Sequence, residues 1–305
     1  GNKLKVLEVK GLKKKLGKRE IIKDISFSVE EGEIFGFLGP NGAGKTTTIR
    51  MLVGLINPNG GSISICGHDL KNDTEKALKE VGAVVENPEL YKYLSGRENL
   101  MQIARIRNIP KTQVDETIKL VGLENRIDDK VRKYSLGMKQ RLGLAASLLS
   151  NPKLLILDEP TNGLDPSGIL DFREVVKKAA KERGMAVFIS SHILSEVQHL
   201  CDRVAFINHG TIKSVENVMN ESMETDTDII CLKLLQEIDT NKLLSIDYIN
   251  SARKTDDGIE IILLSNKTPE LIKYLVNSNY DVQEVFKIRK GLEQRYMELV
   301  EGGIR

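Results

Sequence analysis

Residues Gly39 to Thr46 could bind phosphate groups, because their types and spacing match the pattern G-x-x-x-x-G-K-[ST]. Glycines in such a loop let backbone N–H groups turn inward onto phosphate oxygens. Lys45 would reach the β- and γ-phosphates, and the hydroxyl of Thr46 would ligate Mg²⁺. The nucleotide-binding residues expected here are Gly39, Pro40, Asn41, Gly42, Ala43, Gly44, Lys45, Thr46 and Thr47.

The flanks of this loop favour nucleotide binding over a glycine-rich turn that matches the pattern by chance. Residues 34–38 (IFGFL) form a short apolar run that predicts a buried strand. Residues 47–55 predict a helix, whose positive N-terminal end would face the phosphates. The sequence therefore predicts a strand, a phosphate loop and a helix in the order that a nucleotide site needs.

A pair of carboxylates follows the apolar run LLIL of residues 154–157. Asp158 would end a buried strand and hold the Mg²⁺ that Thr46 also contacts. Glu159 comes next, at the same strand end, where its carboxylate could accept a proton from an attacking water. The alternative is a buried strand that simply stops at an acidic turn, and the phosphate loop disfavours it.

Two further segments carry polar residues that could act on a nucleotide. Ser135 is a good N-cap for an apolar helix over residues 142–149, and Gly137 leaves the backbone exposed near its start. A helix-capping Ser-x-Gly is usually structural, but this one lies between the phosphate loop and the carboxylate pair. His192 follows the apolar pair at residues 188–189, so a strand-end position is favoured over an ordinary surface or core histidine.

Strands and helices alternate over the rest of the first two thirds of the chain. Residues 4–33 alternate apolar and polar side chains, which predicts antiparallel strands, and residues 62–66 predict another strand. Residues 88–150 have helical spacing, with Leu100, Ile103 and Ile106 expected on one face of a helix and Val114, Ile118 and Val121 on one face of the next. Strands at 154–158, 185–190 and 203–207, with helices at 169–183 and 194–201, predict a parallel α/β core.

The composition changes near residue 216, where a polar, acidic stretch to residue 228 predicts a linker. Beyond it we expect strands at 229–234, 248–253, 259–264 and 282–288, and helices at 241–246, 269–276 and 292–300. The order β-α-β-β-α-β resembles a split βαβ, ferredoxin-like module. The predicted domains are therefore residues 1–216 and residues 217–305.

Length and composition are consistent with about two ordinary globular domains in 305 residues. The net charge is +2, so we expect no nucleic-acid partner, and the basic stretch over residues 10–19 is interpreted as a solvated hairpin. No apolar run approaches the roughly 20 residues of a membrane span, and no signal peptide is visible. The three cysteines lack pairing symmetry and metal spacing, which favours a reducing compartment.

Over about residues 4–215 the chain resembles the nucleotide-binding domain of ABC transporters. The resemblance rests on the phosphate loop, on the signature SLGMKQ (135–140), which departs from the common LSGGQ form, on LLILDE (154–159), on the D-loop GLDP (163–166) and on SSH (190–192). It implies an α/β P-loop fold with a parallel core sheet, an antiparallel β subdomain and a helical subdomain over about residues 88–150. The remainder would be a small α+β C-terminal domain that regulates closure, contributes dimer contacts or merely extends the fold.

Two further positions depart from the family pattern. Leu16 stands where the family often has an aromatic residue that stacks on adenine, so apolar contact is all that Leu16 can supply; Tyr134 or another aromatic could substitute. Glu86 stands where a glutamine usually follows the strand of residues 81–85. A carboxylate can still ligate Mg²⁺, so Thr46, Asp158 and Glu86 are the expected metal ligands. This variant, with the YSLGMKQ signature, resembles ATP-binding subunits of bacitracin-type and lantibiotic-immunity exporters.

The resemblance implies the ATP-hydrolysing subunit of an antibiotic or peptide exporter, with ATP and Mg²⁺ as cofactors. Lys45, Glu159 and His192 would be the catalytic residues. Two copies would form a head-to-tail homodimer in which Ser135 and Gly137 of one subunit close on the nucleotide at Lys45 of the other. The transport path would belong to a separate membrane permease, with this chain in the cytoplasm on the inner membrane face. The alternatives are a soluble ABC ATPase acting on nucleic acid or ribosomes, and a regulatory protein with little hydrolysis.

Overall fold

A six-stranded sheet of mainly parallel strands positions the predicted phosphate loop. Its order is β10 (Thr211–Asn217), β9 (Arg203–Asn208), β3 (Ile34–Leu38), β8 (Ala186–Ser191), β7 (Leu154–Asp158) and β6 (Val81–Val84). All pairs are parallel except that of β10 with β9. Every residue of β3 and β8 is buried, as expected for central strands whose two faces are both covered.

An antiparallel sheet of four strands packs against the parallel one. Its order is β2 (Arg19–Glu30), β1 (Lys5–Leu16), β4 (Gly60–Ile65) and β5 (His68–Asp69). Phe27 of β2 stacks between Phe35 of β3 and Phe188 of β8, with ring centroids 5.4 and 5.5 Å away. The basic stretch is the β1–β2 hairpin, as predicted, and Gly17 turns it with a φ of +63°.

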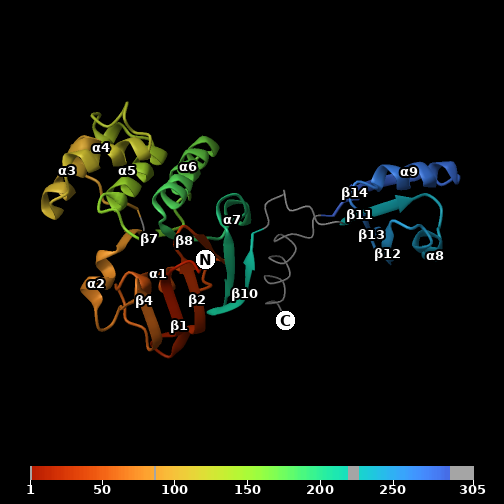
Figure 1. The fold of residues 1–305 in the computed structure, drawn as a ribbon, viewed down its shortest axis with the longest axis horizontal. Helices are drawn as coiled ribbons and strands as arrows, with labels where there is room; N and C mark the ends of the chain where they lie inside the picture. Colours follow the sequence, from red (N-terminus) through yellow and green to blue (C-terminus); the bar gives the residue numbers. More distant parts are fainter. Residues whose placement is uncertain (1, 86, 219–226, 289–305) are drawn as a thin grey trace. The chain divides into compact units, whose positions relative to one another are not determined.

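Eight helical segments complete the described part of this region (Figure 1). They are α1 (Lys45–Leu52), α2 (Thr74–Lys79), α3 (Gly96–Arg107), α4 (Lys111–Leu120), η1 (Val131–Lys133), α5 (Leu136–Leu148), α6 (Pro166–Arg183) and α7 (Leu194–Leu200). Figure 1 shows α3, α4 and α5 grouped on the opposite side of the parallel sheet from β1, β2 and β4. A capping box between Ser95 and Glu98 begins α3.

The prediction that Leu100, Ile103 and Ile106 lie on one apolar face of α3 is partly wrong. Leu100 is fully buried, whereas Ile106 is 83% exposed. Each residue turns an α-helix by about 100°, so two steps of three residues carry Ile106 roughly 120° away from Leu100. The face expected on α4 is confirmed, because Val114 and Ile118 are buried and lie four residues apart.

Several predicted boundaries move; for example, the helices predicted from residues 142 and 169 begin at Leu136 and Pro166, and β11 begins at Thr227 inside the predicted linker. The helix after the phosphate loop begins at Lys45 instead of residue 47, because the left-handed backbone of Gly44 forms its N-cap. Glu216 and Asn217, assigned to the linker, instead extend β10 by pairing with Val204 and Arg203. Antiparallel pairing with a neighbouring strand thus overrides their polar character.

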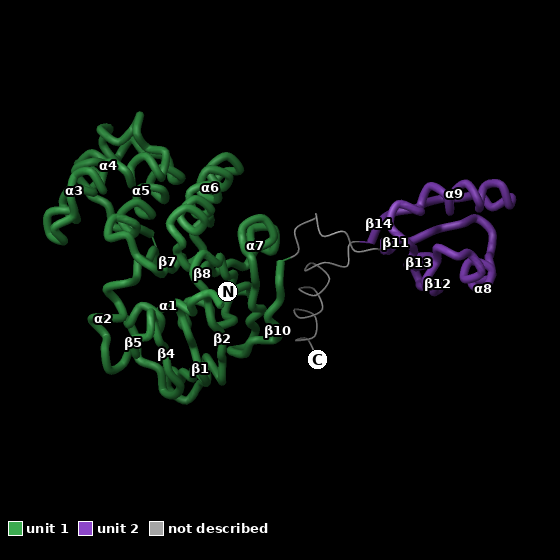
Figure 2. The backbone as a smooth tube through the Cα atoms, in the orientation of Figure 1, with its two compact units in different colours: residues 1–218, 299–305 green, residues 219–298 purple. Residues whose placement is uncertain are grey.

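The structure, a computed structural model, describes residues 2–85, 87–218 and 227–288, and these described residues fall into two compact units, one ending at Val218 and the other beginning at Thr227 (Figure 2). The described part of the second unit comprises β11 (Thr227–Leu234), α8 (Thr240–Leu244), β12 (Ile249–Thr255), β13 (Gly258–Leu264), α9 (Thr268–Asn277) and β14 (Val282–Lys287). Its antiparallel sheet has the order β12-β13-β11-β14. The element order is β-α-β-β-α-β, that of a split βαβ module. The helix predicted over residues 292–300 lies outside the described residues.

Candidate functional site

The phosphate loop follows β3 and leads into α1, and its glycines are required by its geometry. Gly42 and Gly44 have φ values of +79° and +110°, which side chains disfavour. A Cβ on Gly39 would lie 2.2 Å from the carbonyl oxygen of Ile207. The first N–H groups of α1 have no intrahelical acceptor, so they can bind an anion.

The remaining loop residues complete this cradle. The carbonyl oxygen of Pro40 accepts from the N–H of Ala43 at 3.2 Å. Asn41 is exposed, and Thr47 is half-buried within α1. The loop therefore closes on itself and leaves space on its outer side, where nothing lies within 4 Å of a Cβ built on Gly42.

The side chain of Lys45 is buried, with 6% of it exposed, and its ammonium lies among oxygen atoms. It donates to the carbonyls of Gly39 and Pro40 and lies 3.3 Å from Oε1 of Glu159. Burial lowers the pKa of Lys45, while the carboxylates of Glu159 and Asp158 act in the opposite direction. A buried cation needs an anionic partner, and the phosphates of a nucleotide would supply one.

Asp158 ends β7 beside the P-loop, as the sequence predicts for a metal ligand. Its carboxylate accepts a hydrogen bond from the Ser190 hydroxyl at 2.8 Å, and the nearby Thr46 side chain acts to lower the pKa of Asp158. Burial raises the pKa of Asp158, and the hydrogen bond from Ser190 and the charge of Lys45 oppose that rise. A carboxylate and a hydroxyl with phosphate oxygens form a donor set that suits Mg²⁺, so these residues fit the metal.

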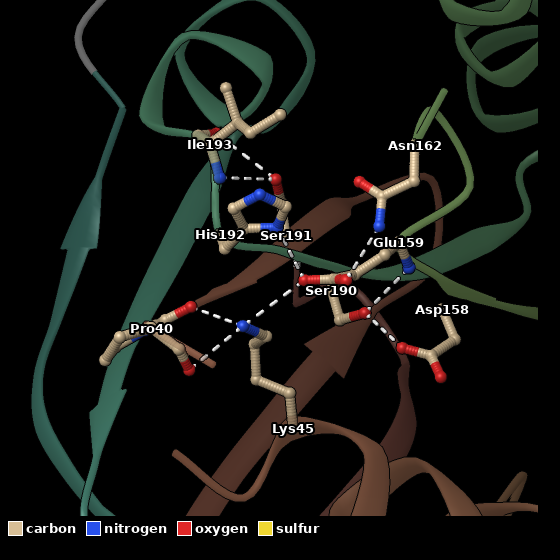
Figure 3. A network of polar contacts seen from close by, with 10 residues as sticks. Pro40, Lys45, Asp158, Glu159, Asn162, Ser190, Ser191, His192 and Ile193 are labelled. Atoms are coloured by element: carbon tan, nitrogen blue, oxygen red, sulfur yellow. Dashed lines mark hydrogen bonds and ion pairs between the residues drawn. The ribbon is translucent and has the colours of Figure 1, made fainter. Parts of the chain in front are cut away.

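Glu159 lies at the centre of the polar network in Figure 3. Oε1 is 2.9 Å from Nδ1 of His192, and Oε2 accepts from Nδ2 of Asn162 at 3.0 Å. Burial alone would raise the pKa of Glu159, but His192 and Lys45 outweigh it and hold the pKa below its ordinary value. Glu159 also has a φ of +42°, a strained backbone for this residue type that clusters at functional sites.

Ser190 is a site residue to which the sequence assigns no role. Its hydroxyl donates to Oδ1 of Asp158 at 2.8 Å and accepts from the N–H of Glu159 at 2.9 Å, as drawn in Figure 3. One fully buried side chain thus holds both carboxylate residues. Asn162 was also missed. In each case the sequence signal was weak, since a serine at a strand end and an asparagine in a turn are common.

Ser135 and Gly137 form a second polar site at the start of α5. The Ser135 hydroxyl accepts from the N–H of Met138 at 3.2 Å, which confirms it as an N-cap. A Cβ on Gly137 would lie 3.7 Å from Cα of Gly168, in the first turn of α6. Among the described residues, the hydrogen bonds of the Ser135 side chain stay within its own helix, so this chain does not bring it to Lys45.

The two departures from the family pattern have different outcomes. Leu16 lies at the tip of the β1–β2 hairpin and is 52% exposed. Tyr134, considered as an alternative base contact, is 5% exposed and donates to the carbonyl of Arg126 at 2.7 Å. It is therefore part of the core below Ser135. Glu86 lies outside the described residues.

Comparison with known proteins assigns the family. The family described as ABC transporter matches residues 22–162. The ABC transporter ATP-binding protein YhcH of Bacillus subtilis, described as uncharacterized, is 49% identical and covers 96% of this chain and 95% of its own length. The bacitracin transport ATP-binding protein BcrA of Bacillus licheniformis is 39% identical, with 98% of each chain covered. The lantibiotic transport ATP-binding protein SrtF of Streptococcus pyogenes is 43% identical over 68% of this chain and 89% of its own.

A solved ATP-binding subunit of an ABC transporter supports the same assignment for the fold. It superposes with a TM-score of 0.63 at 31% identity, over 70% of this chain and 90% of the other. The predicted α/β P-loop fold and the predicted resemblance to bacitracin and lantibiotic relatives are confirmed. From this agreement of fold, site and relatives, the chain belongs to the ABC transporter ATP-binding proteins, a family of ATPases.

Proposed function

We propose that this chain is the ATP-hydrolysing subunit of an ABC exporter for an antibiotic or peptide. The observation that carries the proposal is the position of Glu159. Its carboxylate contacts both Lys45, at 3.3 Å, and His192, at 2.9 Å, at the carboxyl ends of neighbouring parallel strands. Ligands of open α/β sheets bind at these strand ends.

The residues around Glu159 support hydrolysis of the γ-phosphate. A water oxygen would attack the γ-phosphorus, the bond to the β–γ bridging oxygen would break, and Glu159 would take the water proton. Lys45 would exchange its contact with Glu159 for phosphate oxygens. Because Lys45 helps to lower the pKa of Glu159, that exchange would make the carboxylate more basic. His192 would remain beside Glu159 and contact the γ-phosphate.

Thr46 and Asp158 would hold Mg²⁺, which neutralises developing phosphate charge when bound. Ser190 orients the carboxylate of Asp158 from behind, at 2.8 Å. Ordered partners of a ligating carboxylate strengthen metal binding. Glu86 remains a proposed third ligand.

A head-to-tail homodimer would complete the site. Ser135 is exposed, and the neighbouring Leu136 is 45% exposed although it is apolar. Leu170, on the adjacent α6, is 57% exposed. An apolar surface around a polar helix start suits burial against a second subunit. In that arrangement Ser135 and Gly137 would face the phosphates of the other copy.

A separate permease would carry the substrate, and this chain would bind the permease at the inner face of the membrane. No helix among the described residues is long and apolar enough to cross a bilayer. The segment after β6 lines a cavity of about 670 Å³ together with Ile103 and Ile106 of α3. Tyr91 and Ile106 there are 64% and 83% exposed, so the cavity could receive an apolar segment of the permease. The transported class is taken from the bacitracin and lantibiotic relatives.

Substitution of Glu159 tests the hydrolytic part. Glu159→Gln should lower kcat by about 10²–10⁴-fold, the usual contribution of a general base, while ATP binding and ATP-dependent dimerisation persist. The matched control is Glu174→Gln, which alters an exposed carboxylate on α6. Near-normal hydrolysis by Glu159→Gln would exclude Glu159 as the base.

Purification from membranes tests the transport part. The chain should co-purify with a polypeptide that has several membrane spans. Deletion of the gene for this chain should raise the sensitivity of the cells to a peptide antibiotic. Co-sedimentation with ribosomes instead, without a membrane partner, would favour the soluble ATPase.

A further inference from the structure

A buried ion pair joins the two helices that follow the catalytic loops. Arg173 lies on α6 and Glu196 on α7, and Nη2 of Arg173 is 3.3 Å from Oε1 of Glu196. Their side chains are 14% and 7% exposed. Nothing in the proposed hydrolysis uses either residue directly, so this pair needs its own explanation.

The geometry of the pair is poor for stability. Within the described part of the chain, Nε of Arg173 and Oε2 of Glu196 are buried without hydrogen-bond partners. Such atoms have lost their water and gained nothing in return. The pair Arg203–Glu33 provides a contrast, because Nη2 and Nε of Arg203 both reach the carboxylate, at 2.7 and 3.2 Å.

A buried ion pair that adds little stability can still specify position. The helix α6 begins seven residues after Glu159, and Asn162 in the intervening loop donates to the Glu159 carboxylate. The helix α7 begins two residues after His192. Arg173 and Glu196 therefore connect α6 and α7. These two helices follow the loops that carry Glu159 and His192, whose side chains are in contact.

The position of Glu196 makes this connection short. Glu196 lies in the first turn of α7, four residues after His192. The intervening Ile193 is tied back to the strand end, because its N–H donates to Oγ of Ser191 at 2.9 Å. A shift of this first turn relative to α6 would therefore move the imidazole relative to Glu159.

We propose that Arg173 and Glu196 are positioning residues that hold His192 against Glu159. The proposal rests on the hydrolysis proposed at that site. A substitution far from the chemistry that misplaces a reacting group by about 1 Å can reduce turnover by about 100-fold. Loss of the pair therefore lowers kcat. Loss of the pair leaves the affinity for ATP unchanged, because the phosphate loop does not contact Arg173 or Glu196.

The test is the double variant Arg173→Leu/Glu196→Leu in the full-length protein. Replacing both partners by apolar residues of similar size keeps a buried site stable. The expected results are an unchanged thermal midpoint within a few degrees, a Kd for ATP within twofold of the natural chain, and a kcat at least tenfold lower. Arg173→Lys, which keeps the charge, should retain more turnover than the double variant.

Epistasis with His192 separates positioning from a merely structural role. In a His192→Ala background, the double variant should cause no further loss of kcat, because the group that the pair positions is already gone. The control is Glu33→Gln, which weakens the other buried pair, with kcat expected within twofold. Natural kcat in the double variant, or an equal loss with and without His192, overturns the proposal.

These outcomes are distinct from failure of the proposed function. If the natural chain hydrolyses no ATP, or if Glu159→Gln hydrolyses it normally, the proposed function fails. If hydrolysis depends on Glu159 but ignores the pair, the positioning role alone fails.

Discussion

Replacement of Ser190 by alanine should damage both the fold and the metal site, since this hydroxyl serves two carboxylate residues. It donates to Asp158 at 2.8 Å and accepts from the N–H of Glu159 at 2.9 Å, at 0% exposure. Losing a hydrogen bond to a charged group costs about 1.5–3 kcal/mol, and burying an unpaired N–H costs about 1–3 kcal/mol. The Thr46 side chain also favours the ionised carboxylate of Asp158, so we expect the lower half of the combined range, about 3 kcal/mol.

Hydrogen exchange in β7 and β8 measures this loss in the first unit without assuming one transition for both units. A loss of about 3 kcal/mol corresponds to roughly 100-fold faster exchange of the most protected amides. The second readout is the Mg²⁺ dependence of ATP hydrolysis. Its midpoint should rise by about 10–100-fold, the usual cost of losing a partner of a metal ligand.

Ser147→Ala is the control for this experiment. The Ser147 hydroxyl donates to the carbonyl of Leu144 within α5, and a bond of this kind adds little to helix stability. The reasoning is refuted if Ser190→Ala exchanges within a few-fold of the natural chain and keeps its Mg²⁺ midpoint. Refutation would mean that Asp158 and Glu159 are held by other contacts.

Two further predictions concern binding of the adenine base and the loss of stability at acid pH. Leu16→Tyr should tighten ATP binding, because stacking on a base is worth about 1–3 kcal/mol and Leu16 is exposed at a hairpin tip. Calorimetry with ATP and with inorganic triphosphate checks this prediction. Only the affinity for ATP should change, because inorganic triphosphate has no base. Glu159 has a pKa below its ordinary value of 4.5 because His192 and Lys45 outweigh burial. Its stabilising contribution is therefore present above pH 4.5 and is lost as the pH falls through the lower folded value. Glu159→Gln should flatten the loss of stability below pH 4.5, and an identical pH profile in urea unfolding would contradict this.

Local features of the site could be predicted from the sequence because their causes lie within a few residues. The glycines of the phosphate loop and the N-cap at Ser135 depend on backbone conformation over one turn. Asp158 and Glu159 were predicted at a strand end because an apolar run stops there. The relation of Ile106 to Leu100 was misjudged, since a face must be followed by angle and not by repeated steps of three.

The tertiary structure decided which of these pieces meet. Ser190 reaches Asp158 and Glu159 because β7 and β8 pair with Asp158 opposite Ser190, a register between residues 32 positions apart. The contact of Glu159 with His192 has the same origin. No local pattern encodes such partners, because parallel strands are joined by crossovers and their neighbours are chosen by the packing of the whole sheet.

The sequence by itself thus determined a nucleotide loop, two acidic strand-end residues and a helix-capping signature. The structure assembled the first two into one site and left Ser135 and Gly137 on a separate exposed helix start. The physical reason is that phosphate binding needs a local cradle of N–H groups, whereas the other groups must be delivered by folding. For Ser135, the structure of one chain places it at an exposed helix start, and its delivery to a phosphate by a second copy is part of the proposed function.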